Sequence, residues 1–171
     1  MKTILFIFLL SSVLLENLSV TEKSVDQEQL RIYEELFIMR VQYFGGIDLY
    51  IHQDIRHRYT KMAIDHYKND TLNQRVNNKY ILPSITKLNQ RDFNVEKIKV
   101  HSAKIIEQIS DSSYYYIPKI WIGKPVFNKT IDQAILMEAW SYGEFAGEGR
   151  IFIFKKRNNK WKISETIVKW L

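Results

Sequence analysis

The pattern of apolar and polar positions is strongest from residue 114 to residue 171, where it predicts a single antiparallel β-meander. Its centre is Ile131–Tyr142, which is rich in β-forming residues and apolar on both alternating sets of positions. Such a strand is typical of a central position in a sheet that is covered on both faces. Trp140 and Trp161 have apolar neighbours of the same parity, so we expect both indole rings to be largely buried, on neighbouring strands.

Turn-forming residues divide this meander into its strands. Lys119–Phe127 is expected to be extended, with its proline at an edge or a bulge, because proline cannot donate to a ladder. The glycine-rich stretch from 143 to 149 is expected to interrupt the chain before a short apolar strand at Arg150–Lys156. The pair Asn158-Asn159 then predicts a tight hairpin turn, since asparagine tolerates positive φ, and the remaining residues form the last strand.

The N-terminal half predicts two helices and one strand. A capping-box signature at Ser24 and an apolar stripe at helical spacing predict a helix over Val25–Phe44. Ile47–Gln53 alternates between apolar and polar residues and is interpreted as the first strand, with a continuing helix as the alternative. The apolar spacing between Ile55 and Asn69 predicts a second helical segment.

Three shorter segments complete the predicted fold. Helical turns are expected on both sides of Pro83, an edge strand at Lys97–His101 and a short helix at Ala103–Ile109. Together the elements predict one α+β domain over residues 21–171. In it, an N-terminal helical region packs on one face of a curved, mainly antiparallel sheet of about five strands.

The first 20 residues have the features of a secretory signal peptide. Lys2 is followed by the twelve-residue apolar run Ile4–Leu15, which is too short to span a bilayer, and no other stretch is long enough to do so. We therefore expect an exported protein, periplasmic or extracellular, with an uncleaved anchor as the alternative. The chain contains no cysteine, which excludes disulfides, thiol catalysis and cysteine-ligated zinc.

The net charge of +6 favours anionic partners only weakly. The basic residues are spread along the chain, and the run Lys155-Lys156-Arg157 lies at a hairpin end, where solvated charge is ordinary. Export and the absence of a recognisable motif argue against a nucleic-acid partner. An anionic partner or a protein partner is the expectation that remains.

The last third of the chain combines Pro125-Val126-Phe127-Asn128, a strand with Ala134, the glycines from 143 to 149, the turn before Trp161-Lys162-Ile163, and a final Trp170. In this pattern it resembles a group of uncharacterised secreted bacterial proteins. The resemblance implies export and an α+β fold, and it assigns no catalytic residue. The closing turn, Trp-x-Ile and apolar strand are also similar to nuclear transport factor 2-like domains. That likeness implies a curved sheet and N-terminal helices around a cone-shaped pocket.

Glu138 is the first candidate for chemistry, because it shares the parity of Leu136 and Trp140 in a strand that is predicted to be covered. A buried carboxylate needs a partner or a raised pKa. We favour an ion pair with a lysine or arginine of a neighbouring strand, and the alternative is a polar group inside a pocket. Asp54 and His57, three residues apart, form a second candidate acid–base pair if that turn is helical.

The remaining candidates concern ligands. Tyr114, Tyr115 and Tyr116 are a candidate ligand or carbohydrate platform if they are exposed. No histidine pair has the spacing of a helical metal site, and the glycines of 143–149 precede a strand rather than a helix, which argues against a nucleotide loop. We therefore expect no metal and no cofactor.

These observations do not specify a reaction. They favour a non-enzymatic exported binding or interaction module of unknown ligand. The first alternative is a pocket enzyme of nuclear transport factor 2-like type that uses a buried carboxylate, either Glu138 or the Asp54–His57 pair. The second is a toxin-neutralising, immunity-type protein or an envelope-interaction protein.

Overall fold

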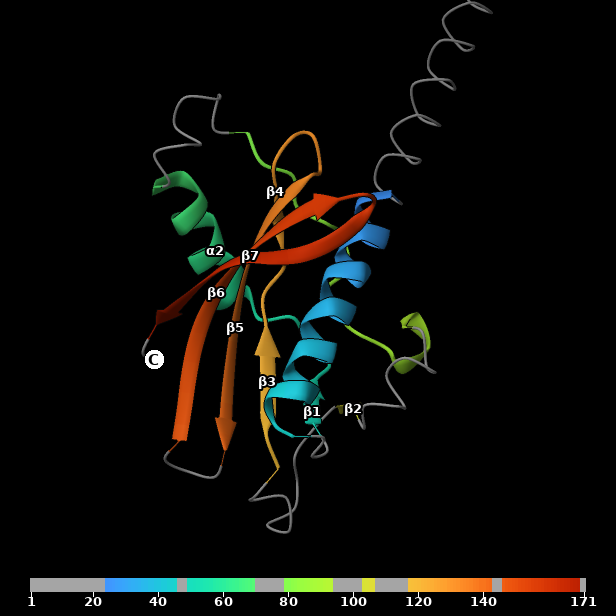
Figure 1. The fold of residues 1–171 in the computed structure, drawn as a ribbon, viewed down its shortest axis with the longest axis vertical. Helices are drawn as coiled ribbons and strands as arrows, with labels where there is room; N and C mark the ends of the chain where they lie inside the picture. The colour runs from blue at the N-terminus through green and yellow to red at the C-terminus, as the bar shows by residue number, and fades with distance from the viewer. Residues whose placement is uncertain are drawn as a thin grey trace, which may run out of the picture.

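The computed structural model describes residues 24–45, 49–69, 79–93, 103–106, 117–142 and 146–169. These residues form an α+β fold in which two helices pack on a mixed, mainly antiparallel sheet (Figure 1), so the predicted fold class is confirmed. No helix in the described ranges is long and apolar enough to cross a membrane. The strands of the sheet are β1 (Leu49–His52), β2 (Ala103–Ile106), β3 (Lys119–Ile122), β4 (Val126–Phe127), β5 (Gln133–Tyr142), β6 (Ala146–Arg157) and β7 (Lys160–Lys169).

The strand order is β2-β1-β3-β5-β6-β7, and β4 also pairs with β5. The described sheet therefore has seven strands, where the sequence predicts about five. β1 runs parallel to both β2 and β3, and all other pairs are antiparallel. Parallel neighbours need a crossover connection, and α2 (His57–Asn69) lies in the connection between β1 and β3. β5, β6 and β7 form the predicted meander.

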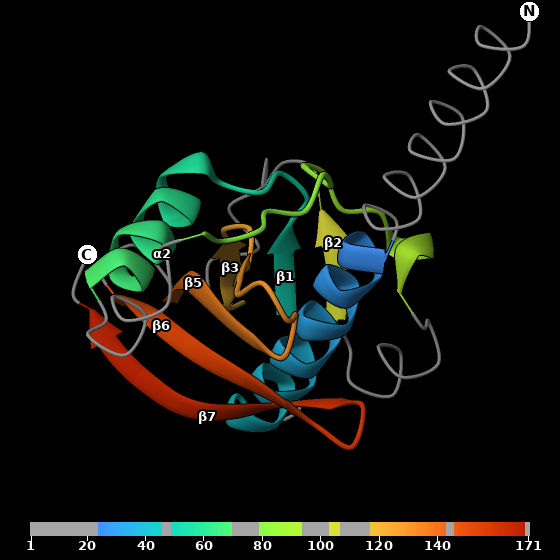
Figure 2. The ribbon, with the colours of Figure 1, turned by 90° about the horizontal axis from the view of Figure 1, so that it is seen from above.

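The two helices cover opposite faces of the sheet (Figure 2). The N-terminal helix, which includes residues 24–43, packs with Leu136 and Phe152 in one core. Helix α2 packs with Ile135 and Met137 in the other. Neighbouring positions of β5 point to opposite sides, so its two apolar sets fill two cores. The prediction that the helical region packs on one face is therefore wrong, although the predicted burial of β5 on both faces is confirmed.

Two predicted helical segments are extended in the structure. Residues 103–106 form β2, which pairs in parallel with β1, so the predicted helix at this position is wrong. A helix of a few residues is marginal by itself, whereas isoleucines suit a strand that finds a partner. The predicted turns around Pro83 are also wrong, because Ile81 exchanges backbone hydrogen bonds with Phe127. The predicted edge strand at Lys97–His101 lies outside the described residues.

Strand β6 begins at Ala146, earlier than the sequence predicts. Gly147 and Gly149 lie within the ladder opposite β5, so the predicted interruption does not extend to residue 149. A Cβ atom at Gly147 would lie 3.2 Å from the carbonyl oxygen of Trp140, so the close approach of the strands favours glycine there. The hairpin turn is confirmed, with φ values of 49° at Asn158 and 59° at Asn159.

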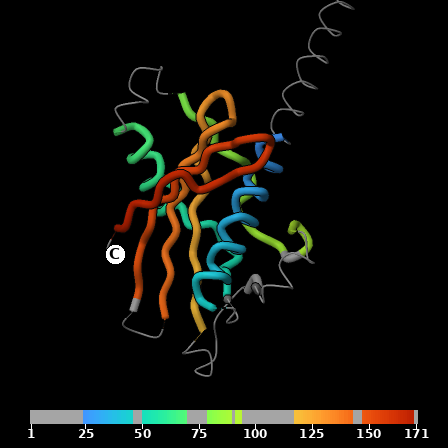
Figure 3. Tube along the Cα trace, viewed as in Figure 1, coloured from blue at the N-terminus to red at the C-terminus, as the bar shows by residue number. Residues whose placement is uncertain are grey.

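The tip of the β6–β7 hairpin lies beside the beginning of the N-terminal helix (Figure 3). Trp161 fills this junction and is 2% exposed, as the sequence predicts. Trp140 is partly buried and packs against the same core, but its strand is separated from that of Trp161 by β6, so the prediction of neighbouring strands is wrong. The difference in burial arises because Trp161 sits under the helix, whereas Trp140 lies near the end of β5.

Candidate functional site

Glu138 is fully buried on the side of the N-terminal helix, as the sequence predicts. Its partner is Arg40, which comes from that helix and not from a neighbouring strand. Arg40 Nε donates to Glu138 Oε2 at 2.9 Å, and Nη2 lies 2.9 Å from the same oxygen. Both side chains are 0% exposed, so the ion pair is sealed inside the protein.

Burial raises the pKa of Glu138, and the charge and hydrogen bond of Arg40 oppose this shift only in part. The geometry explains why the compensation is incomplete. Arg40 contacts one carboxylate oxygen, while Oε1 of Glu138, Nη1 of Arg40 and Nε1 of Trp140 have no hydrogen-bond partner among the described residues. A buried carboxylate with an unmatched oxygen keeps part of its desolvation cost.

Tyr43 separates this buried pair from a second, more exposed one. The guanidinium group of Arg40 lies 5.3 Å from the centre of the Tyr43 ring, and that of Arg150 lies 5.1 Å from it. Arg150 is hydrogen-bonded to Glu148, which lowers the pKa of the Glu148 carboxyl. Each carboxylate of this region thus has its own arginine, an arrangement that stabilises the end of the sheet.

The candidate pair Asp54 and His57 is not brought together. The backbone amide of Asp54 donates to Nδ1 of His52 at 3.2 Å, and its carboxylate lies 3.9 Å from the same nitrogen. His57 begins α2, is exposed and makes no ion pair with Asp54. Partial burial, followed by the charge of Arg56, lowers the pKa of His52. The predicted pair is therefore wrong, because the turn before α2 is not helical and directs Asp54 back toward β1.

The predicted tyrosine platform is not tested by the structure. Tyr114, Tyr115 and Tyr116 lie outside the described residues. Within the ranges that the structure describes, no group of three or more histidine, aspartate or glutamate side chains could hold a metal ion.

The inner side of the β6–β7 hairpin end, which faces the N-terminal helix, carries a paired lysine. Lys156 Nζ lies 3.0 Å from Glu28 Oε1, and Trp161 Nε1 donates to Glu28 Oε2 at 2.6 Å. Arg31 reaches the first of these oxygens at 2.8 Å. Glu28 therefore joins the helix to both strands of the hairpin.

The outer side of the same hairpin end carries four exposed cations, which we call the basic face: Lys155, Arg157, Lys160 and Lys162. Lys155 is directly opposite Lys162, and Arg157 is directly opposite Lys160. Directly paired residues of an antiparallel ladder point to the same face. Among the described residues, none of the four has an acidic partner within ion-pair distance. The basic face is thus a compact set of unpaired positive charges.

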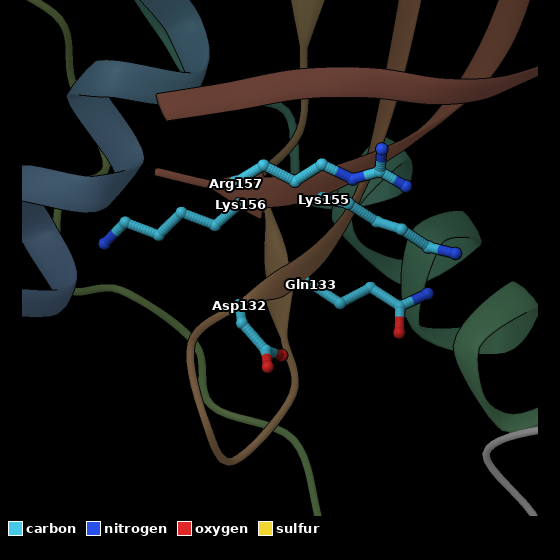
Figure 4. A pocket seen from close by; sticks show the side chains of 5 residues that line it. All are labelled: Asp132, Gln133, Lys155, Lys156 and Arg157. Atoms are coloured by element: carbon cyan, nitrogen blue, oxygen red, sulfur yellow. The ribbon is translucent and has the colours of Figure 1, made fainter. Parts of the chain in front are cut away.

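Close to this face is a surface pocket of about 250 Å³, lined by Asp132, Gln133, Lys155, Lys156 and Arg157. The side chains of Lys155, Arg157 and Gln133 point to one side of the sheet, whereas Lys156 points to the other, toward the N-terminal helix (Figure 4). Asp132 makes no ion pair with the pocket's cations among the described residues, and its carboxylate accepts hydrogen bonds from Asn128 and Thr130. These two bonds lower its pKa.

Acidic residues lie near the basic face. Glu165 lies directly opposite Ile153, which is two residues from Lys155 and points to the same side of the sheet. Glu34 and Glu35 share a second pocket, of about 360 Å³, with Lys160. The positive region is therefore bounded, and it does not extend over the whole surface.

Lys155-Lys156-Arg157 is predicted to be one solvated run, whereas the structure divides it between two sides of the sheet. Strand periodicity was the signal that could have found this division, since period two sends the middle lysine to the opposite side. Comparison with known proteins adds no assignment: no family model, no curated protein and no solved structure matches the chain. The resemblances stated above therefore stay predictions.

Proposed function

We propose that the protein is an exported, non-enzymatic binding module that takes an anionic partner on the basic face. The observation that carries the proposal is the set of four exposed cations that have no ion-pair partner among the described residues, arranged as two like-charged cross-strand pairs. Like charges directly opposite each other destabilise a sheet. An anion bound between them removes this repulsion, so the arrangement suits a ligand better than it suits the free protein.

The buried carboxylate supports a binding module over the pocket enzyme. A catalytic acid or base must reach a substrate, whereas Glu138 is fully buried and is capped by Arg40. Asp54 and His57, the other candidate pair, are apart. The ion pair with Arg40 has the geometry of a structural contact between helix and sheet.

The proposed export depends on the sequence, in which the apolar run Ile4–Leu15 follows Lys2. It is tested by fractionation of the native host, or of a bacterium that expresses the full chain. A form shortened by roughly 20 residues, outside the cytoplasm, is the expected result. A full-length cytoplasmic product would refute this part of the proposal.

Binding is tested by titration of a short polyglutamate peptide, followed by calorimetry at low and at raised salt. Charge-driven binding weakens as salt rises, because exposed charges are screened. The double variant Lys155→Gln/Arg157→Gln is expected to lose most of the binding. The matched control Arg58→Gln/Lys61→Gln removes the same charge from two exposed positions of α2 and is expected to keep it. Equal losses in both variants, or no binding to the parent protein, contradict the proposal.

A further inference from the structure

We infer that the partner is a protein with an extended acidic segment, which adds as a new strand to the free edge of β7. The inference rests on the proposed function and deepens it by naming the partner's chemistry and mode of binding. Two features of β7 carry it: its position in the sheet and the register of its lysines.

β7 ends the strand order of the sheet on one side, and no strand among the described residues pairs with its outer edge. It is ten residues long and mostly exposed, with one buried residue, Trp161. An edge of this length presents backbone N–H and C=O groups that an extended peptide can bind. Such a strand addition supplies affinity through main-chain hydrogen bonds, and the side chains then supply specificity.

The lysines of β7 set the chemistry of those side chains. Lys160 and Lys162 point to the same face of the strand and continue the rows that begin with Arg157 and Lys155 on β6. A strand added beside β7 places its own same-face residues about 5 Å from Lys160 and Lys162. Successive residues on one face of a strand are separated by roughly 6.6 Å, so acidic residues at alternating positions match both lysines.

The surroundings favour such a segment over a continuous polyanion. Glu165 on the same face and Glu34 and Glu35 beside Lys160 interrupt the positive region within a few residues. A nucleic acid or an anionic membrane would meet these carboxylates as well, whereas a peptide can place a neutral residue there. A second copy of the chain paired edge to edge in antiparallel register about these lysines would set them against each other, which is unfavourable.

A simpler reading is that the lysines only protect the edge from self-association, a common role of charged residues on edge strands. The two readings differ in what they expect of ligands. If the lysines only protect the edge, they need only prevent other strands from pairing with β7. If they recognise a partner, a peptide with alternating acidic residues must bind.

The experiment compares four peptides with blocked ends and the same amino-acid composition. In the first, glutamate alternates with threonine. In the second, the glutamates are contiguous. The third and fourth have the alternating sequence with N-methyl groups on alternate amides, one in each phase. Binding to the full protein is measured by calorimetry, and NMR locates the amides of β7 that respond.

The alternating peptide is expected to bind roughly tenfold more tightly than the contiguous one, and N-methylation in one phase is expected to abolish binding. Lys162→Glu should weaken the alternating peptide by at least roughly tenfold. Lys169→Glu serves as the matched control, because it reverses the same charge on the same strand, distant from the basic face. This control is expected to keep the affinity.

Equal affinity for all four peptides would overturn strand addition and leave the proposed anion binding intact. Failure of every peptide, together with polyglutamate, would overturn both. Tighter binding of a single-stranded oligonucleotide or of phosphatidylglycerol vesicles would overturn the assignment to a protein partner. If Lys162→Glu self-associates and no peptide binds to the parent protein, the lysines serve only to protect the edge, and the inference is overturned.

Discussion

The two sides of the β6–β7 hairpin end use the same residue types for different purposes. On the inner side, Lys156 pairs with Glu28, and Trp161 donates to the same carboxylate. On the outer side, Lys155 and Lys162 face each other, and neither has an acidic partner in the part of the chain that the structure describes. A single step along the chain thus separates a lysine that stabilises the fold from one that is free to bind.

At this hairpin the neighbouring layer, and not the residue type, decides the role of a charge. The N-terminal helix covers the inner side and brings Glu28 to the hairpin. Helix α2 packs over Ile135, Ile151 and Ile153, and the strands continue past these residues into the basic face. Partly buried charges are held by their partners, whereas the exposed ones keep their capacity for ligands.

The largest expected effect belongs to the inner side. Trp161→Ala should destabilise the protein by about 3–5 kcal/mol, because it removes a buried aromatic ring that packs against Phe127. Chemical denaturation followed by circular dichroism measures this loss. A variant that unfolds at the same denaturant concentration as the parent would contradict the role of this residue in the core.

Trp161→Phe separates the ring from its hydrogen bond. It keeps most of the apolar contact but leaves Glu28 Oε2 without its donor, so a smaller loss of about 1–3 kcal/mol is expected. Equal losses for the phenylalanine and alanine variants would mean that the hydrogen bond, and not the packing, dominates at this junction.

Glu138→Gln tests the second helix–sheet contact of the inner side. Glutamine keeps the shape but replaces the charged acceptor of Arg40 by a neutral one, so a loss of about 1–3 kcal/mol is expected, and peptide binding at the basic face should be unchanged. Denaturation and calorimetry on the same variant measure the two quantities. Lost binding with unchanged stability would instead identify Glu138 as a residue of the binding site.

The pH dependence of this contact follows from the raised pKa of Glu138. The folded protein binds this proton more tightly than the unfolded chain, so its stabilising contribution is complete below the ordinary value of 4.5 and declines as pH rises toward the folded pKa. Glutamine does not titrate, so the advantage of the parent protein over Glu138→Gln should shrink with rising pH in this window. Burial has the largest effect on the pKa of Glu138 and raises it. Arg40 and Arg150 lower this pKa, and the charge of Glu148 raises it. A constant difference across this pH range would contradict the shift.

The sequence predicts the meander well because its signals are local. The alternation along β5 and the asparagine turn need no knowledge of the rest of the chain. β2 is different, because its residues become a strand only beside β1, a neighbour more than fifty positions away in the sequence. Propensity gives way to tertiary pairing in such short segments.

The candidate site also combines features that the sequence predicts with features that depend on distant parts of the chain. Parity alone predicts that Glu138 is interior, but only the docking of the N-terminal helix supplies Arg40 as its partner. The basic face could have been predicted from the sequence, because it depends only on the turn at Asn158-Asn159 and on the two-residue period of a strand. The sequence could not predict that these cations have no acidic partner among the described residues, because this depends on which layer covers each side of the hairpin.

A matched pair of substitutions tests the comparison directly. Lys156→Met should cost about 1 kcal/mol, because it breaks the partly buried ion pair with Glu28. Lys155→Met, one residue away, should change the free energy of unfolding by less than about 0.5 kcal/mol. The binding of polyglutamate should show the reverse order, with the larger loss for Lys155→Met. If both lysines affect stability and binding alike, the two sides of the hairpin do not differ as described.

The smallest expected effect is a gain. Lys162→Glu replaces the like-charged pair with Lys155 by an opposite-charged one across the same two strands, so the free energy of unfolding should rise by about 0.2–1 kcal/mol. Lys169→Glu is the control, because its partner on β6 is Gly149 and no charge lies directly across from it. Both are measured by denaturation at low salt, and the gain should shrink at high salt because exposed charges are screened. A protein that becomes more stable while it loses its acidic ligand would show that the repulsion between these lysines is retained for binding. A loss of stability in Lys162→Glu alone would show instead that Lys162 has a structural role.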